Sequence, residues 1–319
     1  MSDWFPKLKD IMNCAYFMNL IVTGGAGFVG NNLVKHLVKK GHKVTVIDNL
    51  HKGKKEDLQN VFNKIEFFEI DVRDYDKLRN HFKDVDGVFH EAALTAVPES
   101  FLIPQEYHDV NVRGTENLLK LAKEFGFKLV YASSSSVYGD TEKIPIKENF
   151  ERKPINPYGQ TKLDGELVAE KYSKIGVKAI GLRYFNIFGI GQTGSYAGVI
   201  TKFMKNLDEK KPLVINGDGT QVRDFIYVED VAEANLVAME SKIDNGFFNI
   251  GTGMATSIKQ LAHIMIELSN SSVDFVFSES LKGDIKKSQA DIELTDKLLG
   301  WKFQTDLKSG LQKIMPKIT

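Results

Sequence analysis

Short apolar runs alternate with longer helix-like segments from residue 19 to residue 182 of this 319-residue chain. The runs are rich in β-branched residues, as expected of strands that are buried on both faces. They cover residues 19–23, 43–47, 65–70, 87–90, 128–132 and 177–182. Apolar residues at helical spacing fill the intervals, as Leu33 and Leu37 do in one and Leu118 and Ala122 in another. Strands alternating with helices predict an α/β fold built on a doubly wound parallel sheet.

The composition excludes several classes of function. Lys and Arg residues number 42, as do Asp and Glu residues, so the chain lacks the excess positive charge expected of a nucleic-acid or membrane-surface binder. Its single cysteine, Cys14, allows no intrachain disulfide, which favours a reducing cytoplasm. The uncharged stretch 11–34 contains four Gly and four Asn and suits a buried strand and turn better than a membrane span. We expect no nucleic-acid partner, no membrane segment and no bound metal.

A glycine-rich turn follows the first predicted strand. The sequence TGGAGFVG satisfies the GxxGxxG spacing from Gly24 and the GxGxxG spacing from Gly25. At such a turn the backbone approaches a pyrophosphate at a helix N-terminus, where N–H groups favour anions. Asp48, at the end of the second strand, can accept a hydrogen bond from a ribose 2′-hydroxyl. The pattern predicts a dinucleotide site that favours NAD over NADP, although three lysines close to Asp48 weaken that preference.

The character of the sequence changes after Arg183. Gly-rich loops at 188–198 and 216–220 precede scattered short strands and helices. We expect residues 18–185 to form an NAD-binding Rossmann domain that regains about 224–250, and residues 186–319 to form a smaller α/β substrate-binding lobe. No Pro- or Ser-rich linker separates the two, so we expect them to pack closely. Residues 1–17 lack the pattern of a signal peptide and are expected to be an extension before the fold.

Tyr158 and Lys162 form the clearest catalytic pattern in the chain. Four residues apart on a predicted helix, they share one face. A nearby ammonium favours the phenolate, so Lys162 is expected to lower the pKa of Tyr158 and make it a general base for a hydroxyl group. Ser134, at the end of the fifth strand, is placed to steady that proton. The alternative is a solvated helix face, which the Ser-rich strand end and the glycine turn disfavour.

Other candidates lie where the third and fourth strands end. Asp71 and Val72 follow the third strand, and Ala92 and Ala93 follow the fourth. Doubly wound sheets bind their ligands at these carboxyl ends, although ordinary loops also occupy them. His90, in the sequence VFHEAA, is expected to be a hydrogen-bonded structural residue rather than a catalyst.

Several long motifs occur together, from Met18 almost to the C-terminus. They are TGGAGFVG, DVRD, VFHEAA, NVRGT, YASSSSVYG, NPYGQTK, LRYFNIFG, RDFIYVEDVAEAN, FNIGTG and GDIKKSQAD. This set resembles the extended short-chain dehydrogenase/reductase family, and within it the UDP-glucose and UDP-N-acetylglucosamine 4-epimerases. The resemblance implies tightly held NAD that takes hydride from C4 of the sugar and returns it to the other face of a 4-keto intermediate.

Members of that family perform different reactions on the same intermediate. Nucleotide-sugar 4,6-dehydratases carry Asp-Glu where this chain has Ser135 and Ser136, because eliminating water needs an added acid and base. UDP-glucuronate decarboxylases usually carry Glu at the position of Ser136. With two serines at these positions, the chain keeps the residues for oxidation at C4 but lacks the acid and base for elimination. This favours an epimerase.

The resemblance also implies roles for individual residues. Cofactor contacts are implied for Gly24, Gly27, Phe28, Val29, Asp48, Asn49, Gly53, Asp71, Val72, Ala92, Ala93, Asn111 and Tyr184, together with Tyr158 and Lys162. Substrate contacts are implied for Thr95, Ser134, Asn186, Gly198, Val199, Arg223, Asp284 and Ser288. Tyr158 resembles the base, Lys162 its activator and ribose anchor, and Ser134 the proton partner. Arg223 would neutralise phosphate charge, with an ion pair to Asp224 or Asp230 as its structural alternative.

Two positions bear on the substrate. Relatives carry Arg-x-Gly-Asp where this chain reads Leu281 to Asp284, so one phosphate-binding arginine is missing, and lysine does not reproduce its bidentate geometry. Ser288 stands where a residue walls the pocket beside the C2 substituent of the sugar. A large Tyr there restricts relatives to plain hexoses, whereas a small residue admits an N-acetyl group. Ser288 therefore predicts UDP-GlcNAc and UDP-GalNAc as substrates and leaves room for UDP-glucose and UDP-galactose.

The sequence thus predicts an NAD-dependent 4-epimerase of UDP-hexoses. The family resemblance implies a homodimer formed through the Tyr158 helix and the helix after Asn111. Two alternatives remain: a nucleotide-sugar lyase and a non-catalytic NAD-binding protein. The two serines oppose the first, and the intact Tyr158 and Lys162 pair opposes the second.

Overall fold

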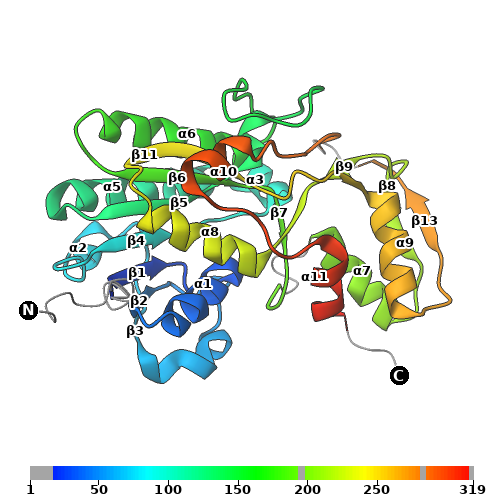
Figure 1. The fold of residues 1–319 in the computed structure, drawn as a ribbon, viewed down its shortest axis with the longest axis horizontal. Helices are drawn as coiled ribbons and strands as arrows, with labels where there is room; N and C mark the ends of the chain where they lie inside the picture. The colour runs from blue at the N-terminus through cyan, green and yellow to red at the C-terminus, as the bar shows by residue number, and fades with distance from the viewer. Residues whose placement is uncertain (1–16, 193–197, 281–284, 316–319) are drawn as a thin grey trace, which may run out of the picture.

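The computed structural model describes residues 17–192, 198–280 and 285–315, and at its centre lies a parallel sheet (Figure 1). Its seven strands run in the order β11-β6-β5-β4-β1-β2-β3. They are β1 (Asn19–Thr23), β2 (Lys43–Ile47), β3 (Ile65–Phe68), β4 (Gly87–His90), β5 (Lys128–Ser134), β6 (Ala179–Tyr184) and β11 (Asn245–Ile250). The predicted doubly wound parallel sheet is confirmed, and the six expected strands lie within two residues of their predicted bounds.

The strand order reverses between β1 and β4. From β1 the chain builds outward through β2 and β3, and it then returns to place β4 on the other side of β1. Thr23 is level with Ile47 of β2 and with His90 of β4, so the carboxyl ends of these three strands meet at one edge. Ligands of doubly wound folds bind outside this edge, at the point where the order reverses.

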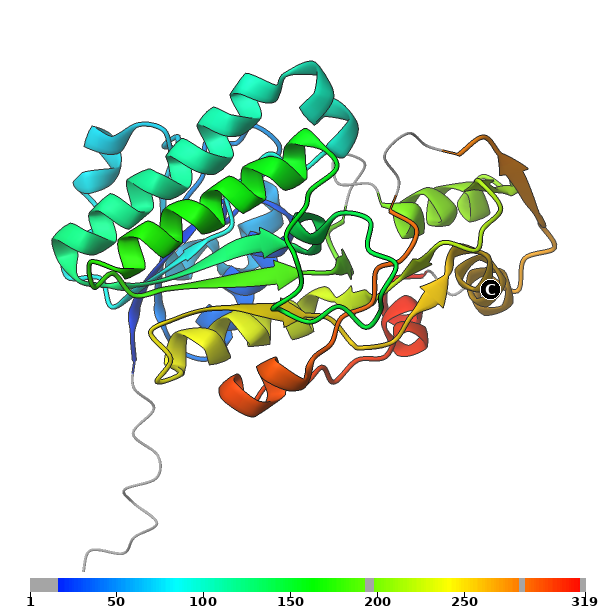
Figure 2. The ribbon, with the colours of Figure 1, turned by 90° about the horizontal axis from the view of Figure 1, so that it is seen from above.

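Helices cover both faces of the sheet (Figure 2). On one face lie α5 (Gly114–Phe125) and α6 (Pro157–Ser173), and on the other α1 (Phe28–Lys39) and α8 (Val228–Glu240). Each face has its own buried apolar cluster, which includes Leu118 and Leu129 on one side and Leu33 and Ile180 on the other. Burial on both faces explains why the strands are apolar without alternation.

Short elements complete this part of the molecule. They are α2 (Tyr75–Arg79), α3 (Val97–Leu102), α4 (Pro104–His108), the 3₁₀ segments η1 (Lys55–Lys64) and η3 (Ser135–Tyr138), and the π-helical turn η2 (Asp109–Arg113). The elements α3, α4 and η2 pack on α6. Within the described ranges, no helix combines the length and apolarity needed to cross a membrane.

A smaller lobe lies at the right of Figure 1. It contains three strand pairs: β7 (Asn186–Phe188) with β10 (Phe225–Tyr227), β8 (Leu213–Asn216) with β13 (Phe275–Ser278), and β9 (Val222–Arg223) with β12 (Thr256–Ser257). Its helices are α7 (Val199–Asp208), α9 (Ile258–Ser269) and α11 (Leu307–Ile314). These elements share a third core, in which Phe188, Phe203, Leu261 and Leu311 are buried.

The chain crosses between the two parts several times. After β10 it returns to the main sheet as α8 and β11, and later as α10 (Glu293–Leu299), which packs on β11. Trp301 joins the same core as α1 and α8. We propose two units. The first comprises residues 18–185 and about 224–250. The second lies within residues 186–319, except that α10 and Trp301 pack on the first unit. Of residues 1–17, only Phe17 is described.

Candidate active site

A cavity of about 770 Å³ opens where the strand order reverses. Residues from the ends of the central strands line one part of it, and residues from β7 and the start of α7 line another. Most residues that the sequence analysis singled out line this cavity: Gly24, Gly27, Phe28, Val29, Asp48, Asn49, Gly53, Val72, Ala92, Ala93, Thr95, Ser134, Tyr158, Lys162, Tyr184, Asn186, Gly198 and Val199. Segments far apart in the chain therefore meet at one site.

Two of the proposed cofactor residues make hydrogen bonds to neighbouring segments of the protein. Asp71 and Asn111 are not among the described residues that line the cavity. The Asp71 carboxylate pairs with Arg73 and accepts a bond from Asn49, and the Arg73 contact lowers the pKa of Asp71 to about 2. The Asn111 amide holds both backbone groups of Leu94, at 2.8 and 2.9 Å, so it fixes the segment after β4. Both side chains thus hold segments of the protein together, and their contacts with the cofactor stay a prediction.

Two of the proposed substrate residues in the smaller lobe donate hydrogen bonds to the same carbonyl oxygen. In the described part of the chain, Arg223 and Ser288 do not line the cavity. Ser288 is buried and its N–H donates to the Val222 carbonyl at 3.2 Å, while Arg223 donates to the same oxygen at 2.8 Å. Asp284 and the segment from Leu281 lie outside the described residues.

The alternative partners of Arg223 have other contacts. The Asp224 carboxylate accepts bonds from the backbone N–H groups of Thr252, Gly253 and Ala290. Asp230 accepts bonds from two backbone N–H groups at residues 304 and 305. Both carboxylates therefore tie loops together.

The glycine turn leaves no room for larger residues. Gly24 has a φ of +70°, and a Cβ there would lie 2.5 Å from the Ala92 nitrogen. A Cβ on Gly30 would lie 2.1 Å from the Gly24 carbonyl oxygen. The turn leads into α1, whose N-cap Gly27 makes no side-chain cap bond and whose first turn carries no acid. The positive end of the helix therefore faces the cavity, which fits a pyrophosphate.

Asp48 stands at the wall of the same cavity. Its carboxylate accepts bonds from the backbone N–H groups of Ala26, at 2.9 Å, and Leu50, at 2.7 Å. Burial raises the pKa of Asp48, and these two bonds oppose the increase. The side chain is thus held at the end of β2 with acceptor capacity left for the hydroxyl groups of a ribose.

Local structure fixes the catalytic pair. The Asn156 side chain caps α6 by accepting a bond from the Gly159 N–H at 2.8 Å, and Pro157 begins the helix. Lys162 lies one turn after Tyr158, its Nζ 5.9 Å from the centre of the Tyr158 ring. That Nζ donates to the Ala132 carbonyl of β5 at 2.8 Å. The pair thus sits at the end of the sheet.

The electrostatics of the pair differ from the expectation. The sequence predicts that Lys162 lowers the pKa of Tyr158, but burial raises it, and a hydrogen bond with Ser134 is the opposing contribution. Burial also lowers the pKa of Lys162 to about 8, against the charges of Glu91 and then Glu166. The reason is that both side chains are buried, and burial disfavours the charged form of each group.

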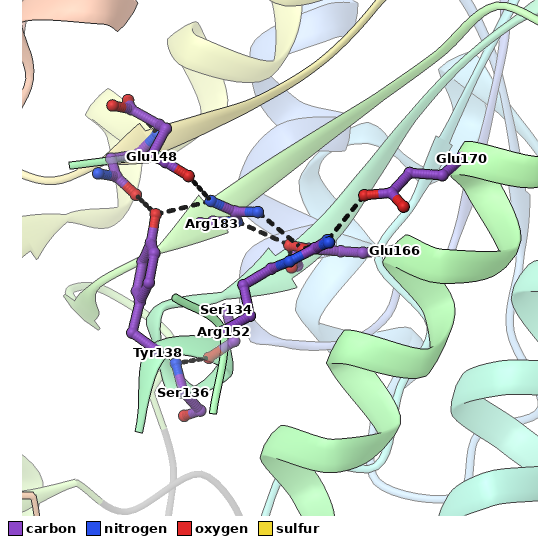
Figure 3. A network of polar contacts seen from close by, with 10 residues as sticks. Ser134, Ser136, Tyr138, Glu148, Arg152, Glu166, Glu170 and Arg183 are labelled. Atoms are coloured by element: carbon purple, nitrogen blue, oxygen red, sulfur yellow. Dashed lines mark hydrogen bonds and ion pairs between the residues drawn. The ribbon is translucent and has the colours of Figure 1, made fainter. Parts of the chain in front are cut away.

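A buried polar network supports the end of β5 (Figure 3). The Glu166 carboxylate accepts bonds from Ser133 at 2.6 Å, from Nε and Nη2 of Arg183 at 2.8 Å each, and from Arg152 at 3.0 Å. Arg183 also donates to the Tyr138 hydroxyl at 2.8 Å. The sequence analysis missed this network. One feature of the sequence could have indicated it: Arg183 is a charged residue inside an apolar strand.

Glu91 was also missed. It follows β4, lines the cavity and accepts a bond from the Tyr184 hydroxyl at 2.8 Å. Burial raises the pKa of Glu91 to about 7. The neighbouring His90 bonds Thr23 and Thr115 at 2.7 and 3.0 Å, and burial lowers its pKa to about 3. His90 is therefore a neutral, hydrogen-bonded residue, as predicted, and Glu91 is the one that faces the cavity.

Comparison with known proteins agrees with this geometry. A putative UDP-glucose 4-epimerase of Methanocaldococcus jannaschii is 37% identical, over 93% of this chain and 97% of that protein. The structure of a UDP-glucose 4-epimerase with UDP-glucose from Thermotoga maritima matches with a TM-score of 0.89 and 35% identity, covering 93% of this chain and 97% of that one.

A second solved structure matches equally well. It is a UDP-N-acetylglucosamine 4-epimerase from Methanobrevibacter ruminantium in complex with UDP-N-acetylmuramic acid, with a TM-score of 0.89 and 36% identity, covering 94% and 97% of the two chains. Residues 20–251 match the family model described as the NAD dependent epimerase/dehydratase family. The resemblance found in the motifs is thereby confirmed. The chain belongs to the NAD-dependent epimerase/dehydratase family, and its cofactor is NAD.

Proposed function

We propose that this protein interconverts UDP-hexoses that differ in configuration at C4. One observation carries the proposal: Tyr158, Lys162 and Ser134 line the same cavity as the glycine turn and Asp48. A general base and a dinucleotide site in one cavity suit the oxidation of a secondary alcohol. The epimerase names of the relatives support the reaction class.

The chain's own groups would manage the proton. Tyr158, as the phenolate, takes the proton of the sugar 4-hydroxyl and later returns it to O4, so no net proton is released. The Ser134 hydroxyl, which is hydrogen-bonded to Tyr158, steadies the oxygen that carries the charge. The Lys162 ammonium, held by the Ala132 carbonyl, offsets the negative charge of the phenolate. Bound NAD supplies the hydride acceptor and donor for C4.

The segment after Ser134 disfavours a lyase. Ser135 and Ser136 open the turn η3, and the Ser136 N–H donates to Ser134 Oγ at 3.1 Å. Neither serine is a carboxylic acid, so neither supplies the acid and base that elimination of water requires. We infer that the 4-keto sugar is reduced again rather than dehydrated or decarboxylated.

The proposed substrates are UDP-GlcNAc and UDP-GalNAc, with UDP-glucose and UDP-galactose also turned over. The small side chain of Ser288 motivates the first pair. Residue 287 forms a β-bridge with Val222 of β9, next to Arg223. We propose that the C2 substituent approaches this segment and that Arg223 approaches the diphosphate. The two solved relatives carry names of both substrate classes.

Product analysis tests the function. The protein is incubated separately with UDP-GlcNAc, UDP-glucose and UDP-glucuronate, and the sugars are identified by NMR and mass spectrometry. Epimerisation yields a C4 epimer of unchanged mass. A product lighter by water or by carbon dioxide would instead establish a lyase, and no product from any UDP-sugar would favour a non-catalytic NAD-binding protein.

The assembly and the compartment are also proposals. We propose a homodimer in which α5 and α6, which form an outer layer in Figure 2, face the partner. Leu167 of α6 and Leu102 at the end of α3 are exposed at 39% and 81%, which suits a covered surface. Light scattering at a mass near 36 kDa would contradict the dimer. The single cysteine supports a cytoplasmic location.

A further inference from the structure

Glu91 is fixed in place from two sides. Its backbone N–H donates to the Thr23 carbonyl at 3.0 Å, which anchors the residue to the end of β1. Its Oε1 accepts a hydrogen bond from the Tyr184 hydroxyl at 2.8 Å. Asn235, fully buried on α8, donates to that same hydroxyl at 2.8 Å and to the Val231 carbonyl at 2.9 Å. A chain of hydrogen bonds therefore runs from α8 to a carboxylate in the active-site cavity.

Donor and acceptor can be assigned at each hydrogen bond of this chain. Burial holds the pKa of Tyr184 well above its usual value, so its hydroxyl stays protonated and donates to Glu91. The Asn235 amide nitrogen can only donate, so Tyr184 accepts from it. The carboxylate of Glu91 is the acceptor at the end. Burial raises the pKa of Glu91 to about 7, so above that pH the arrangement orients a negative charge.

Lys162 is the buried cation that the negative charge of Glu91 would stabilise. It is 9% exposed and donates to the Ala132 carbonyl. Glu91 lines the same cavity as Lys162, and the charges of Glu91 and then Glu166 favour the ammonium form of Lys162. Glu166 is already paired with Arg183 and Arg152. Glu91 is therefore the carboxylate whose charge is left for Lys162.

The other polar groups around Lys162 do not replace Glu91. Tyr158 on α6, Ser133 and Ser134 on β5 and Tyr184 on β6 line the same cavity as Lys162, and His90 on β4 is close enough for the Lys162 charge to lower its pKa. His90 is neutral, because burial keeps its pKa near 3. The hydroxyl groups are neutral donors or acceptors. Apart from the phenolate that Tyr158 forms during the reaction, none of these groups supplies negative charge to the buried ammonium.

We propose that Glu91 is a positioning residue that keeps the Lys162 ammonium charged beside Tyr158. It touches neither reacting atom; it acts through Lys162. The proposal rests on the proposed function, in which charged Lys162 offsets the phenolate of Tyr158. Without Glu91, Lys162 would lose its proton at a lower pH, and above that pH no ammonium would offset the phenolate of Tyr158.

Titration of Lys162 tests the proposal without turnover. The NAD-loaded protein is labelled with ¹³Cε-lysine, and the Lys162 signal is assigned by its loss in Lys162→Met. Glu91→Gln keeps an acceptor for Tyr184 and removes the charge, so the titration midpoint of Lys162 should fall by about 1–3 pH units. Glu91→Met, a second neutral variant, should give the same shift if glutamine packs poorly. Glu91→Asp should restore most of the midpoint.

A matched control uses the same chemical change elsewhere on the helix. Glu170, two turns after Lys162 on α6, pairs with Arg152, and Glu170→Gln should leave the Lys162 midpoint unchanged. In turnover, Glu91→Gln should move the alkaline limb of kcat to lower pH and leave KM unchanged. A one-unit shift would leave roughly a tenth of Lys162 charged at pH 8 instead of half.

The outcomes separate the two proposals. An unchanged Lys162 midpoint in the neutral variants would overturn the role of Glu91, even if the wild type is an active epimerase. Lack of turnover in the wild type would overturn the proposed function while leaving the titration result readable. A fall in kcat at every pH by the same factor, with no shift of the limb, would also contradict the role, since it would point to a structural defect.

Discussion

At the scale of single residues, the active site places two titratable groups in the same dry environment. Burial raises the pKa of Tyr158 and lowers the pKa of Lys162 to about 8, so each group on its own resists ionisation. Together they can form a phenolate and ammonium pair, because each charge offsets the other. The Lys162 ammonium thus offsets the charge of the phenolate that accepts the substrate proton.

Tyr158→Phe tests this base directly. The variant keeps the ring but loses the proton acceptor, so kcat should fall by about 10²–10⁴-fold. NAD should remain bound, as measured by release of the nucleotide on denaturation. Tyr172→Phe, near the C-terminal end of the same helix and not among the described residues that line the cavity, is the matched control and should keep full activity. Near-normal turnover in Tyr158→Phe would refute the mechanism.

Ser288→Tyr tests the proposed substrate preference. Added bulk should lower kcat/KM for UDP-GlcNAc and UDP-GalNAc much more than for UDP-glucose and UDP-galactose, because the N-acetyl group occupies the space that tyrosine fills. Ser288→Ala keeps the space and should behave like the wild type. Ser288 is 4% exposed, so circular dichroism must show that the larger side chain is accommodated. Equal losses for both pairs would remove the gatekeeper role.

At the scale of helices and strands, local pattern predicted most of the fold. The six strands were found because strands buried on both faces are continuously apolar, and the catalytic helix was found from the spacing of Tyr158 and Lys162. The two-residue strands β9 and β12 and the π-helical turn η2 have no such signature. Asn111 shows the limit: no local pattern indicates that its amide holds both backbone groups of Leu94.

The same limit applies to charge. The Glu166 and Arg183 contact joins residues on α6 and β6, and Glu91 acquires its role from Tyr184 and Asn235. These contacts depend on how the elements pack, so no local pattern reveals them. Sequence reasoning therefore yields candidates for the reaction more readily than the residues that support those candidates.

Two elements at the cavity are joined by an ion pair that should affect cofactor retention. Lys52, in the loop after β2, lies 2.7 Å from the Glu99 carboxylate on α3, and the Tyr107 hydroxyl donates to that carboxylate at 2.9 Å. Both joined segments line the cavity. We expect Glu99→Gln to speed NAD release by about two- to fivefold, the scale of a partly exposed pair.

Dialysis over time, or a fluorescence chase, measures the rate of NAD release. The wild type should contain NAD as purified, and the effect of Glu99→Gln should shrink at high salt, since salt screens the pair. Glu116→Gln removes a similar exposed pair, with Lys120 on α5, and should not change the rate. Finding NADP in the purified wild type would contradict the role of Asp48.

At the scale of the whole molecule, one buried ion pair connects the sheet to its covering layer. Glu166 is 0% exposed on α6, and Arg183 is 2% exposed on β6, with Ser133 of β5 bonded to the same carboxylate. Arg183 also reaches Tyr138 and the Glu148 carbonyl (Figure 3). Such a network costs desolvation energy, and it is favourable only because the charged groups are satisfied together.

Breaking this network should therefore destabilise the protein as a whole. Glu166→Gln leaves the Arg183 guanidinium buried without its countercharge, so the free energy of unfolding should fall by about 3–5 kcal/mol. Glu170→Gln, which loses only a partly exposed contact with Arg152, should cost less than about 1 kcal/mol. Urea unfolding of the two variants in the presence of saturating NAD measures the difference. If Glu166→Gln costs no more than Glu170→Gln, the network does not hold α6 to the sheet, and the catalytic helix must be positioned by its apolar face alone.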